Sequence, residues 1–148
     1  MKNIFFDMDG TIADLYNIPN WKEELDSFNP SPYKNAGTLV KVTIFSAIVN
    51  ILQQKGYQIG IISWLSKNSN EDYDKQVTAS KINWLIDNFP LVKWDKIAII
   101  PYGIDKSFFL EDSDDIIFDD SPIVRKKWKG KAYNEKRIFE ILEKLLDN

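Results

Sequence analysis

Short apolar runs, each long enough for one buried strand, alternate along the chain with longer segments whose apolar residues repeat at helical spacing. The strand-like runs cover residues 4–6, 57–63, 96–100 and 115–118, and a fifth, edge strand is expected at 131–133. The helical segments cover residues 38–55, 71–89, 122–128 and 134–146, and a short one is expected at 21–28. Strands that alternate with helices favour a parallel sheet with helices on both faces. The sequence therefore predicts an α/β fold, a three-layer doubly wound parallel sheet.

The length of the chain, 148 residues, suits one domain of ordinary size, and neither a linker nor an internal repeat is visible. We therefore expect residues 1–148 to form a single domain. Residues 12–36 are its least regular part, because they contain Pro19, Pro30 and Pro32. They form a small insert between the first strand and the first long helix.

The chain contains no histidine and no cysteine. Disulfides, thiolate zinc sites and nucleophilic cysteines are therefore excluded, and so are Ser-His-Asp catalysis and histidine metal sites. Any chemistry has to come from carboxylates, lysines, hydroxyl groups and the backbone. A metal ion that is held only by oxygen ligands is expected to be Mg²⁺.

The formal net charge of −3 argues against a protein whose main role is to grip nucleic acid. The apolar run near the N-terminus is too short for a signal peptide, and no stretch is long enough to cross a bilayer. We therefore expect a cytoplasmic protein without a membrane partner. The sequence does not indicate an oligomeric state.

Polar residues close three of the predicted strands: Asp7, Ser63 and Asp119. Ligands of open parallel sheets bind beyond the carboxyl ends of the strands, so these side chains mark the expected site. Asp7 and Asp9 project to the same side of an extended chain, and Gly10 then permits a tight turn. Two carboxylates held together can divide the work: one stays ionised and attacks, while the other gives a proton to a leaving oxygen.

The segment Asp7-Met8-Asp9-Gly10-Thr11 resembles motif I of the haloacid dehalogenase (HAD) superfamily. Further along, Ser63 resembles the motif II hydroxyl, Lys106 the motif III lysine and Asp119-Asp120 the motif IV acidic pair. The order of these motifs matches the family over almost the whole chain. The resemblance implies the Rossmann-like HAD fold with residues 12–36 as a very small cap, and an Mg²⁺-dependent phosphatase.

The resemblance also implies a role for each motif residue. Asp7 attacks phosphorus and becomes an aspartyl-phosphate, and Asp9 protonates the leaving alkoxide and then activates water. Ser63 donates a hydrogen bond to one phosphoryl oxygen, and Lys106 neutralises another. The implied Mg²⁺ site consists of Asp7, the backbone carbonyl of Asp9, Asp119 and Asp120, the last of these directly or through a water molecule.

Within the superfamily, residues 104–107 and the pattern Lys81-x-x-Trp84 resemble the 5′(3′)-deoxyribonucleotidases, which implies a nucleoside monophosphate as substrate. The chain departs from that branch where Ser121-Pro122 follows the acidic pair and where Trp64 follows Ser63. The motif III lysine stays open between Lys106 and Lys81. We expect Lys106 to be functional and Lys81 to lie on a solvated helix face.

Aromatic residues near the motifs are candidates for stacking on a nucleobase. Tyr16 and Trp21 lie nearest to motif I in the sequence, and Trp64 follows motif II. We expect these three residues to bind the substrate, with Phe28 and Tyr33 as further candidates.

Two alternative functions stay open. The basic run at residues 125–131 surrounds Trp128 and could contact a polynucleotide backbone, which would suit a polynucleotide 3′-phosphatase. A HAD-fold protein that only binds and has lost catalysis is an alternative of another class. A phospho-accepting receiver domain does not fit, because its acidic pair would come early in the chain.

An acidic run at residues 111–115 looks at first like a calcium loop. It lacks the glycine and the terminal glutamate that an EF-hand loop needs at fixed spacing. We expect it to form an exposed turn before the fourth strand.

Overall fold

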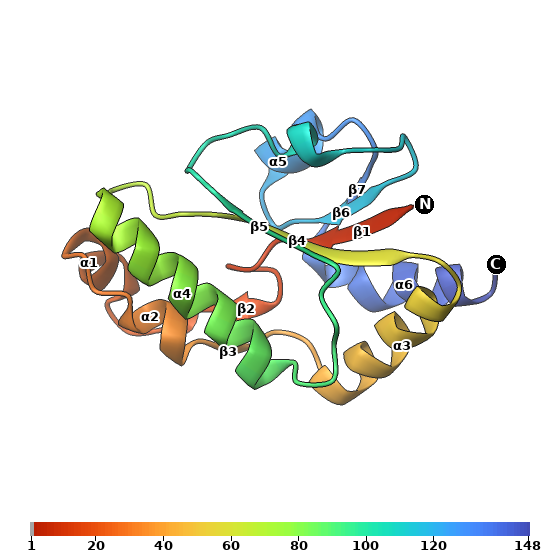
Figure 1. Ribbon diagram of the computed structural model, residues 1–148, viewed down its shortest axis with the longest axis horizontal. Helices are drawn as coiled ribbons and strands as arrows, with labels where there is room; N and C mark the ends of the chain where they lie inside the picture. The colour runs from red at the N-terminus through yellow and green to blue at the C-terminus, as the bar shows by residue number, and fades with distance from the viewer. Residues whose placement is uncertain (1) are drawn as a thin grey trace.

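The computed structural model describes residues 2–148. Its centre is a five-stranded sheet in which all neighbouring strands are parallel, in the order β5-β4-β1-β6-β7 (Figure 1). The strands are β1 (Asn3–Phe6), β4 (Gln58–Trp64), β5 (Lys96–Ile100), β6 (Ile116–Phe118) and β7 (Lys131–Tyr133). The predicted strands are confirmed, and β7 lies at the edge of the sheet as expected.

Helices cover both faces of this sheet (Figure 1). One face carries α3 (Val42–Gln54), α4 (Glu71–Asn88) and α6 (Ile138–Leu146), which follows the 3₁₀ helix η3 (Glu135–Arg137). The other face carries α5 (Pro122–Lys127) and the 3₁₀ helix η2 (Lys106–Phe109). The predicted three-layer α/β fold is therefore confirmed. None of the helices within residues 2–148 combines the length and the apolarity needed to cross a membrane.

The central strand β1 is buried from both sides. Phe6 points to the face that carries α3, where its ring centroid lies 5.0 Å from that of Phe45. Phe5 points to the opposite face and lies 5.9 Å from Trp128 by the same measure. Since successive side chains of a strand point to opposite faces, an unbroken apolar run suits a strand that is covered twice. This packing fixes the carboxyl end of β1, where Asp7 begins.

The segment between β1 and α3 contains only short elements. They are β2 (Ala13–Asp14), the 3₁₀ helix η1 (Leu15–Asn17), α1 (Trp21–Asp26), α2 (Ser31–Asn35) and β3 (Gly37–Thr38). The short helix expected at 21–28 is confirmed as α1. The sequence does not predict α2, because Pro32 reads as a breaker; Pro32 lies in the first turn of α2, where a missing N–H costs little.

One helix boundary needs correction, and three apolar residues of the long helices face solvent. The helix expected at 38–55 begins only at Val42, and Leu39 precedes it and is exposed. Ile44 and Ile51 lie on the exposed side of α3, and Ile86 lies on the exposed side of α4. Apolar spacing alone does not tell which residues of a wide apolar stripe meet the sheet.

Asp115, directly before β6, is fully buried, so the expectation of an exposed turn is wrong at this residue. Its carboxylate accepts hydrogen bonds from the backbone N and Nδ2 of Asn3, at 2.8 and 3.0 Å. It also accepts from the backbone N–H groups of Glu111 and Asp112, at 2.9 and 3.1 Å. Burial alone would raise the pKa of the Asp115 carboxyl, but these donors outweigh burial and hold it below its ordinary value.

We expect Asp115→Asn to lower the free energy of unfolding by about 3 kcal/mol at pH 7, because an amide NH₂ would face N–H donors in a buried site. A depressed folded-state pKa gives stability that is present above the unfolded pKa of about 4 and is lost as the pH falls through the folded value. The difference from wild type, measured by urea unfolding, should therefore shrink below pH ~4.

Asp114→Asn is the matched control for this prediction. Asp114 is partly exposed and forms surface ion pairs with Lys2 and Lys131, at 3.3 and 3.1 Å. Such pairs contribute little, so we expect an unfolding curve close to that of wild type. Equal effects of the two substitutions would contradict a structural role for the buried carboxylate.

Candidate active site

Asp7 stands at the carboxyl end of the central strand, and its backbone N–H donates to the carbonyl of Phe118 at 2.9 Å. The chain then turns around the Met8 carbonyl, which accepts hydrogen bonds from the backbone N–H groups of residues 11–13 at 2.9–3.0 Å. Gly10 has φ +81°, and a Cβ there would collide with the Asp120 carboxylate and the Tyr16 ring. Only glycine therefore satisfies both the left-handed backbone and the close approach.

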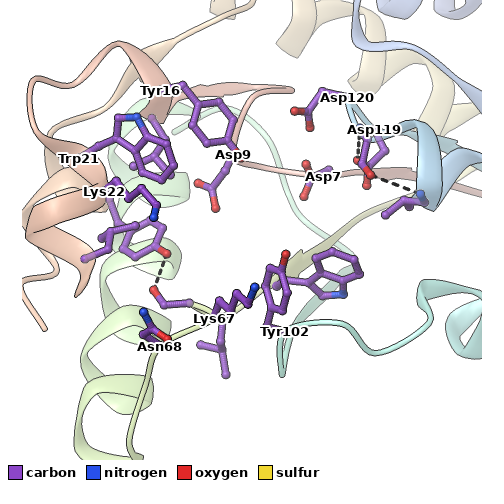
Figure 2. Close-up of a pocket in the computed structure, with 18 of the residues that line it drawn as sticks. Asp7, Asp9, Tyr16, Trp21, Lys22, Lys67, Asn68, Tyr102, Asp119 and Asp120 are labelled. Carbon is purple, nitrogen blue, oxygen red and sulfur yellow. Dashed lines mark hydrogen bonds between the residues drawn. The ribbon is translucent and has the colours of Figure 1, made fainter. Parts of the chain in front are cut away.

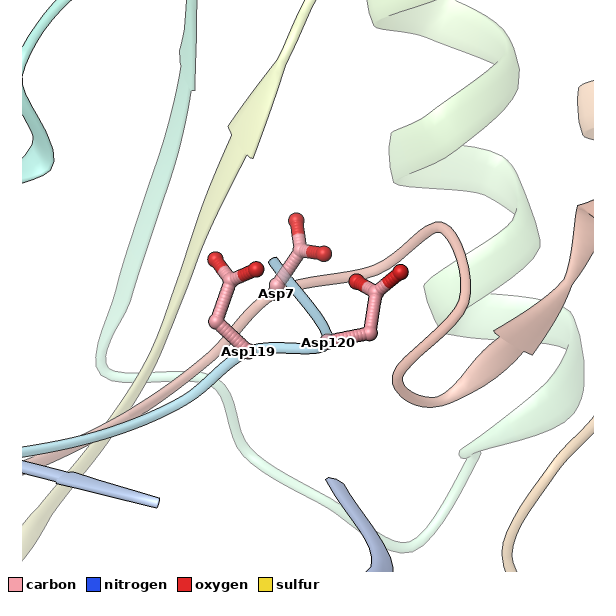
Figure 3. Close-up of side chains that lie close together, drawn as sticks. All are labelled: Asp7, Asp119 and Asp120. Carbon is pink, nitrogen blue, oxygen red and sulfur yellow. The ribbon is translucent and has the colours of Figure 1, made fainter. Parts of the chain in front are cut away.

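Carboxylates from distant parts of the sequence converge beyond β1 and β6 (Figure 3). Asp7 follows β1, while Asp119 and Asp120 follow β6, the parallel neighbour of β1. One oxygen atom of each of these three side chains lies within 4.8 Å of the others. The hydroxyl of Thr11 joins the group: it lies 3.3 Å from Asp7 Oδ2 and accepts the backbone N–H of Asp120 at 3.2 Å.

The ammonium group of Lys106 bridges two of these carboxylates. Its Nζ donates to Asp7 Oδ1 at 2.9 Å and to Asp119 Oδ2 at 2.7 Å, and the side chain is only 2% exposed. Lys106 begins η2, which is capped by the Asp105 side chain accepting the backbone N–H of Ser107 at 2.9 Å. The structure thus brings Lys106 into the acidic cluster, as expected from the sequence.

Lys81 also lies in the site, so its assignment to a solvated helix face is wrong: the side chain is 1% exposed. One turn along α4 on either side, Val77 and Leu85 are fully buried, and Lys81 shares their face. Its Nζ donates to Asp9 Oδ2 at 2.8 Å, to Ser63 Oγ at 2.7 Å and to the Trp64 carbonyl at 2.7 Å.

Ser63 closes β4 as expected, but it is fully buried. Among the residues that the structure describes, it is not one of those that line the adjacent pocket, whereas Asp7 and Asp9 are. Its hydroxyl oxygen accepts a hydrogen bond from the buried ammonium group of Lys81. A contact between Ser63 and a ligand therefore stays a prediction.

The site holds more negative than positive charge. Four carboxylates, those of Asp7, Asp9, Asp119 and Asp120, face the two ammonium groups of Lys81 and Lys106.

Burial, with the Asp7 carboxylate close by, raises the pKa of Asp120 to about 8. The same two causes raise the pKa of Asp119. When all four carboxylates are ionised the site carries two surplus negative charges, which a divalent cation would neutralise, and an all-oxygen donor set suits Mg²⁺. The residues present therefore fit a divalent cation between Asp7, Asp119 and Asp120.

Asp9 has a different environment from Asp7. Its carboxylate is 17% exposed, and burial raises its pKa; the Lys81 ammonium opposes this shift and the Asp7 carboxylate adds to it. A carboxyl group with a raised pKa is suited to carry and release a proton. The environment of Asp9 thus suits the role of the acid.

A pocket with a volume of about 520 Å³ opens in front of the carboxylates (Figure 2). Aromatic side chains line it from two sides: Tyr16, Trp21 and Tyr33 come from the segment after β1, and Trp64 and Tyr102 from the ends of β4 and β5. The three aromatic residues predicted to bind the substrate therefore all reach the pocket. Phe28 does not line it and packs edge-on against Tyr73, with ring centroids 5.4 Å apart.

Trp64 is held in place by a hydrogen bond and lies beside a buried lysine. Its indole N–H donates to the carbonyl of Ile104 at 2.9 Å, and the Lys106 ammonium lies 5.2 Å from its ring centroid. Trp64 therefore connects the aromatic wall with the charged end of the pocket.

Sequence reasoning missed several residues that line the pocket: Lys22, Lys67, Asn68 and Tyr102 (Figure 2). Apart from Lys22, they belong to loops after β4 and β5, whose approach to Asp7 depends on the strand order, and no local pattern shows that order. For Lys81 a signal existed, because it is four residues from both Val77 and Leu85 on one helix face.

No protein-family model matches the sequence, and no curated protein matches it at a significant level. A D,D-heptose 1,7-bisphosphate phosphatase from Burkholderia thailandensis is similar in structure, with a TM-score of 0.56 and 12% identity, covering 100% of this chain and 100% of that one. The enzyme of the same name from B. bronchiseptica, complexed with magnesium and phosphate, has a TM-score of 0.51 and 12% identity, covering 97% of this chain and 99% of that one. The chain therefore shares the Rossmann-like α/β fold of these two structures.

Proposed function

We propose that the protein is an Mg²⁺-dependent phosphatase that hydrolyses a small phosphomonoester through a phosphorylated Asp7. The observation that carries the proposal is the cluster of Asp7, Asp119 and Asp120, joined by Lys106, at the carboxyl end of the central strand. The fold likeness supports it, because both similar structures are named as phosphatases and one of them holds magnesium and phosphate.

In the first half of the reaction, a carboxylate oxygen of Asp7 attacks phosphorus and the ester P–O bond breaks. Asp9 gives its proton to the leaving oxygen, so that an alcohol departs. Lys106, which already donates to Asp7 and Asp119, has a third N–H for a phosphoryl oxygen. A bound Mg²⁺ would supply charge neutralisation to the phosphoryl oxygens from its place between Asp7, Asp119 and Asp120.

In the second half, Asp9 takes a proton from a water molecule, whose oxygen attacks the phosphorus of the aspartyl-phosphate. The bond between phosphorus and the Asp7 oxygen breaks, which releases inorganic phosphate and restores both carboxyl groups to their first state.

We propose that residues 12–36 act as the small cap over this chemistry within a single domain. The cap residues Tyr33 and Asp26 accordingly bond to the loop after β4, with Tyr33 Oη 2.6 Å from Ser66 Oγ and Asn68 Nδ2 donating to Asp26 Oδ1 at 3.0 Å.

Our first choice of substrate is a nucleoside monophosphate. The aromatic side chains of Tyr16, Trp21, Trp64 and Tyr102 flank the pocket, and a planar base can stack on such walls. The volume of about 520 Å³ is in the range of small-ligand pockets.

A phosphorylated sugar with a second anionic group is the second candidate. Lys22 and Lys67 line the pocket and could attract such a group (Figure 2). The similar structures are named as phosphatases of a heptose bisphosphate, which agrees with this choice.

A polynucleotide 3′-phosphatase is less well supported. Trp128, the aromatic residue of the basic run, is buried against Phe5 and therefore cannot stack on a base. Arg125 of the same run donates to the backbone carbonyl of Asp119 at 2.8 Å and so supports the acidic cluster.

A phosphate-release screen with and without Mg²⁺ tests the proposal. The substrates are nucleoside monophosphates, sugar mono- and bisphosphates, and 3′-phosphorylated oligonucleotides. We expect Mg²⁺-dependent release from at least one small monoester, and EDTA should abolish it. A protein that binds these compounds in a calorimeter but hydrolyses none of them would be a binding protein instead.

We expect Trp21→Ala to raise KM for a nucleoside monophosphate on the order of tenfold, since loss of one stacking wall costs about 1–3 kcal/mol. Ribose 5-phosphate, which has no base to stack, should show an unchanged KM. Phe28→Ala is the matched control, because Phe28 lies in the same segment as Trp21 but outside the pocket. It should leave KM for both substrates unchanged. Equal losses for both substrates would argue against base stacking on Trp21.

A further inference from the structure

Lys81 is a buried cation that the proposed chemistry does not use directly. Its side chain is 1% exposed, in the middle of α4. Burying an ammonium group is costly unless charged and polar partners replace its water shell. The partners of Lys81 therefore indicate what it does.

All three protons of this ammonium group have acceptors. They go to Asp9 Oδ2 at 2.8 Å, to Ser63 Oγ at 2.7 Å and to the Trp64 carbonyl at 2.7 Å. The ring of Tyr33 lies beside it, with its centroid 4.8 Å from Nζ. Lys81 is therefore saturated by the protein itself.

Lys106 differs from Lys81 in this respect. Lys106 lines the pocket and donates to two carboxylates, which leaves one N–H for a ligand. Lys81 is not among the described residues that line the pocket, and it has no proton left to donate. The two lysines therefore have different tasks: Lys106 can touch a phosphoryl group, whereas Lys81 acts only on its neighbours.

The neighbours of Lys81 belong to two different parts of the fold. Asp9 lies in the turn after β1, while Ser63 and Trp64 end the adjacent strand β4. Lys81 thus ties a turn to a strand. Its ammonium group binds Oδ2 of Asp9 and leaves Oδ1 for the pocket. Because Ser63 Oγ accepts a hydrogen bond from Nζ, the Ser63 hydroxyl proton must point away from Lys81.

We propose that Lys81 is a positioning residue, which fixes the Asp9 carboxyl group so that it can protonate the leaving oxygen and which orients the Ser63 hydroxyl. This inference rests on the proposed function in one respect, the role of Asp9 as the acid. A proton from Asp9 matters most for a poor leaving group such as an alkoxide, and least for a nitrophenolate, which departs unprotonated.

The test compares Lys81→Met with wild type on an alkyl phosphate, the best small monoester of the screen, and on p-nitrophenyl phosphate. We expect kcat/KM, which reports the steps up to departure of the leaving group, to fall on the order of 100-fold for the alkyl substrate, as for loss of a general acid, and less than about tenfold for the aryl substrate. Lys75→Met is the matched control, because Lys75 lies on the same helix and is 74% exposed beside Glu71. It should leave both rates unchanged.

Equal losses of kcat/KM on the two substrates would overturn the proposal, since a general weakening of the fold affects both alike. Lys81→Gln, which keeps a polar donor without the charge, serves if Lys81→Met does not fold by circular dichroism.

A crystal structure of the folded variant gives a second answer that needs no activity. We expect the Asp9 side chain to leave its present position; an unmoved Asp9 would overturn the proposal. A wild-type protein that hydrolyses no monoester would refute the proposed function instead, and the position of Asp9 would still decide the role of Lys81.

Discussion

Asp7→Asn is expected to abolish turnover, with kcat reduced on the order of 10⁴-fold or more, as for loss of a nucleophile in other enzymes. The amide has nearly the same shape as the carboxylate but does not attack phosphorus. The backbone N–H of residue 7 keeps its bond to the Phe118 carbonyl at 2.9 Å, and Lys106 keeps Asp119 as a partner at 2.7 Å, so the variant should fold. Initial rates of phosphate release measure the effect.

A phosphoenzyme assay shows whether turnover passes through a covalent intermediate that needs Asp7. Acid-quenched wild type should carry one phosphoryl group by intact mass during turnover, and Asp7→Asn should carry none. Asp14→Asn is the control, since Asp14 lies close in sequence but bonds to Asn17 away from the carboxylate cluster. If Asp7→Asn still formed a phosphoenzyme, another residue would be the nucleophile.

One physical reason lets the sequence predict both the parallel sheet and the convergence of Asp7 and Asp119. Apolar runs of strand length alternate with helices, which requires parallel strands, and parallel strands place their carboxyl ends at one edge. Asp7 and Asp119 each follow such a run directly, so their convergence depends only on the pairing of β1 with β6. The sequence does not show this pairing, but any order with these strands adjacent has the same consequence.

Burial of charged residues could not be predicted in the same way. Asp115 is buried because backbone N–H groups surround it, and such donors leave no mark in the sequence. Lys81 is buried because its partners Asp9 and Ser63 arrive from other elements. On a helix considered alone, a lysine between apolar residues is expected to reach solvent along its flexible stem. The tertiary contacts decide the outcome at both positions.

Lys106→Met should lower kcat/KM on the order of 10³-fold, the effect of removing one group that stabilises transition-state charge. Unlike Lys81→Met, it should affect alkyl and aryl phosphates equally, because Lys106 lies against the phosphoryl site and not against Asp9. Steady-state rates on the two substrates measure this difference. Lys126→Met, an exposed lysine on α5, is the control and should retain wild-type rates.

The same variant is expected to separate stability from activity. In metal-free Lys106→Met, the carboxylates of Asp7 and Asp119 lack the ammonium group that bridges them in wild type, at 2.9 and 2.7 Å. Removing one partner of a buried ion pair costs about 3 kcal/mol or more, which corresponds to a Tm about 10 °C lower for a domain of this size. Mg²⁺ binding between the carboxylates should restore most of this Tm in a thermal melt but not the rate, because an ion at Asp7, Asp119 and Asp120 cannot replace the Lys106 contact to the phosphoryl oxygen. A Tm in EDTA that equals that of wild type would contradict the surplus of negative charge on which the proposed metal site depends.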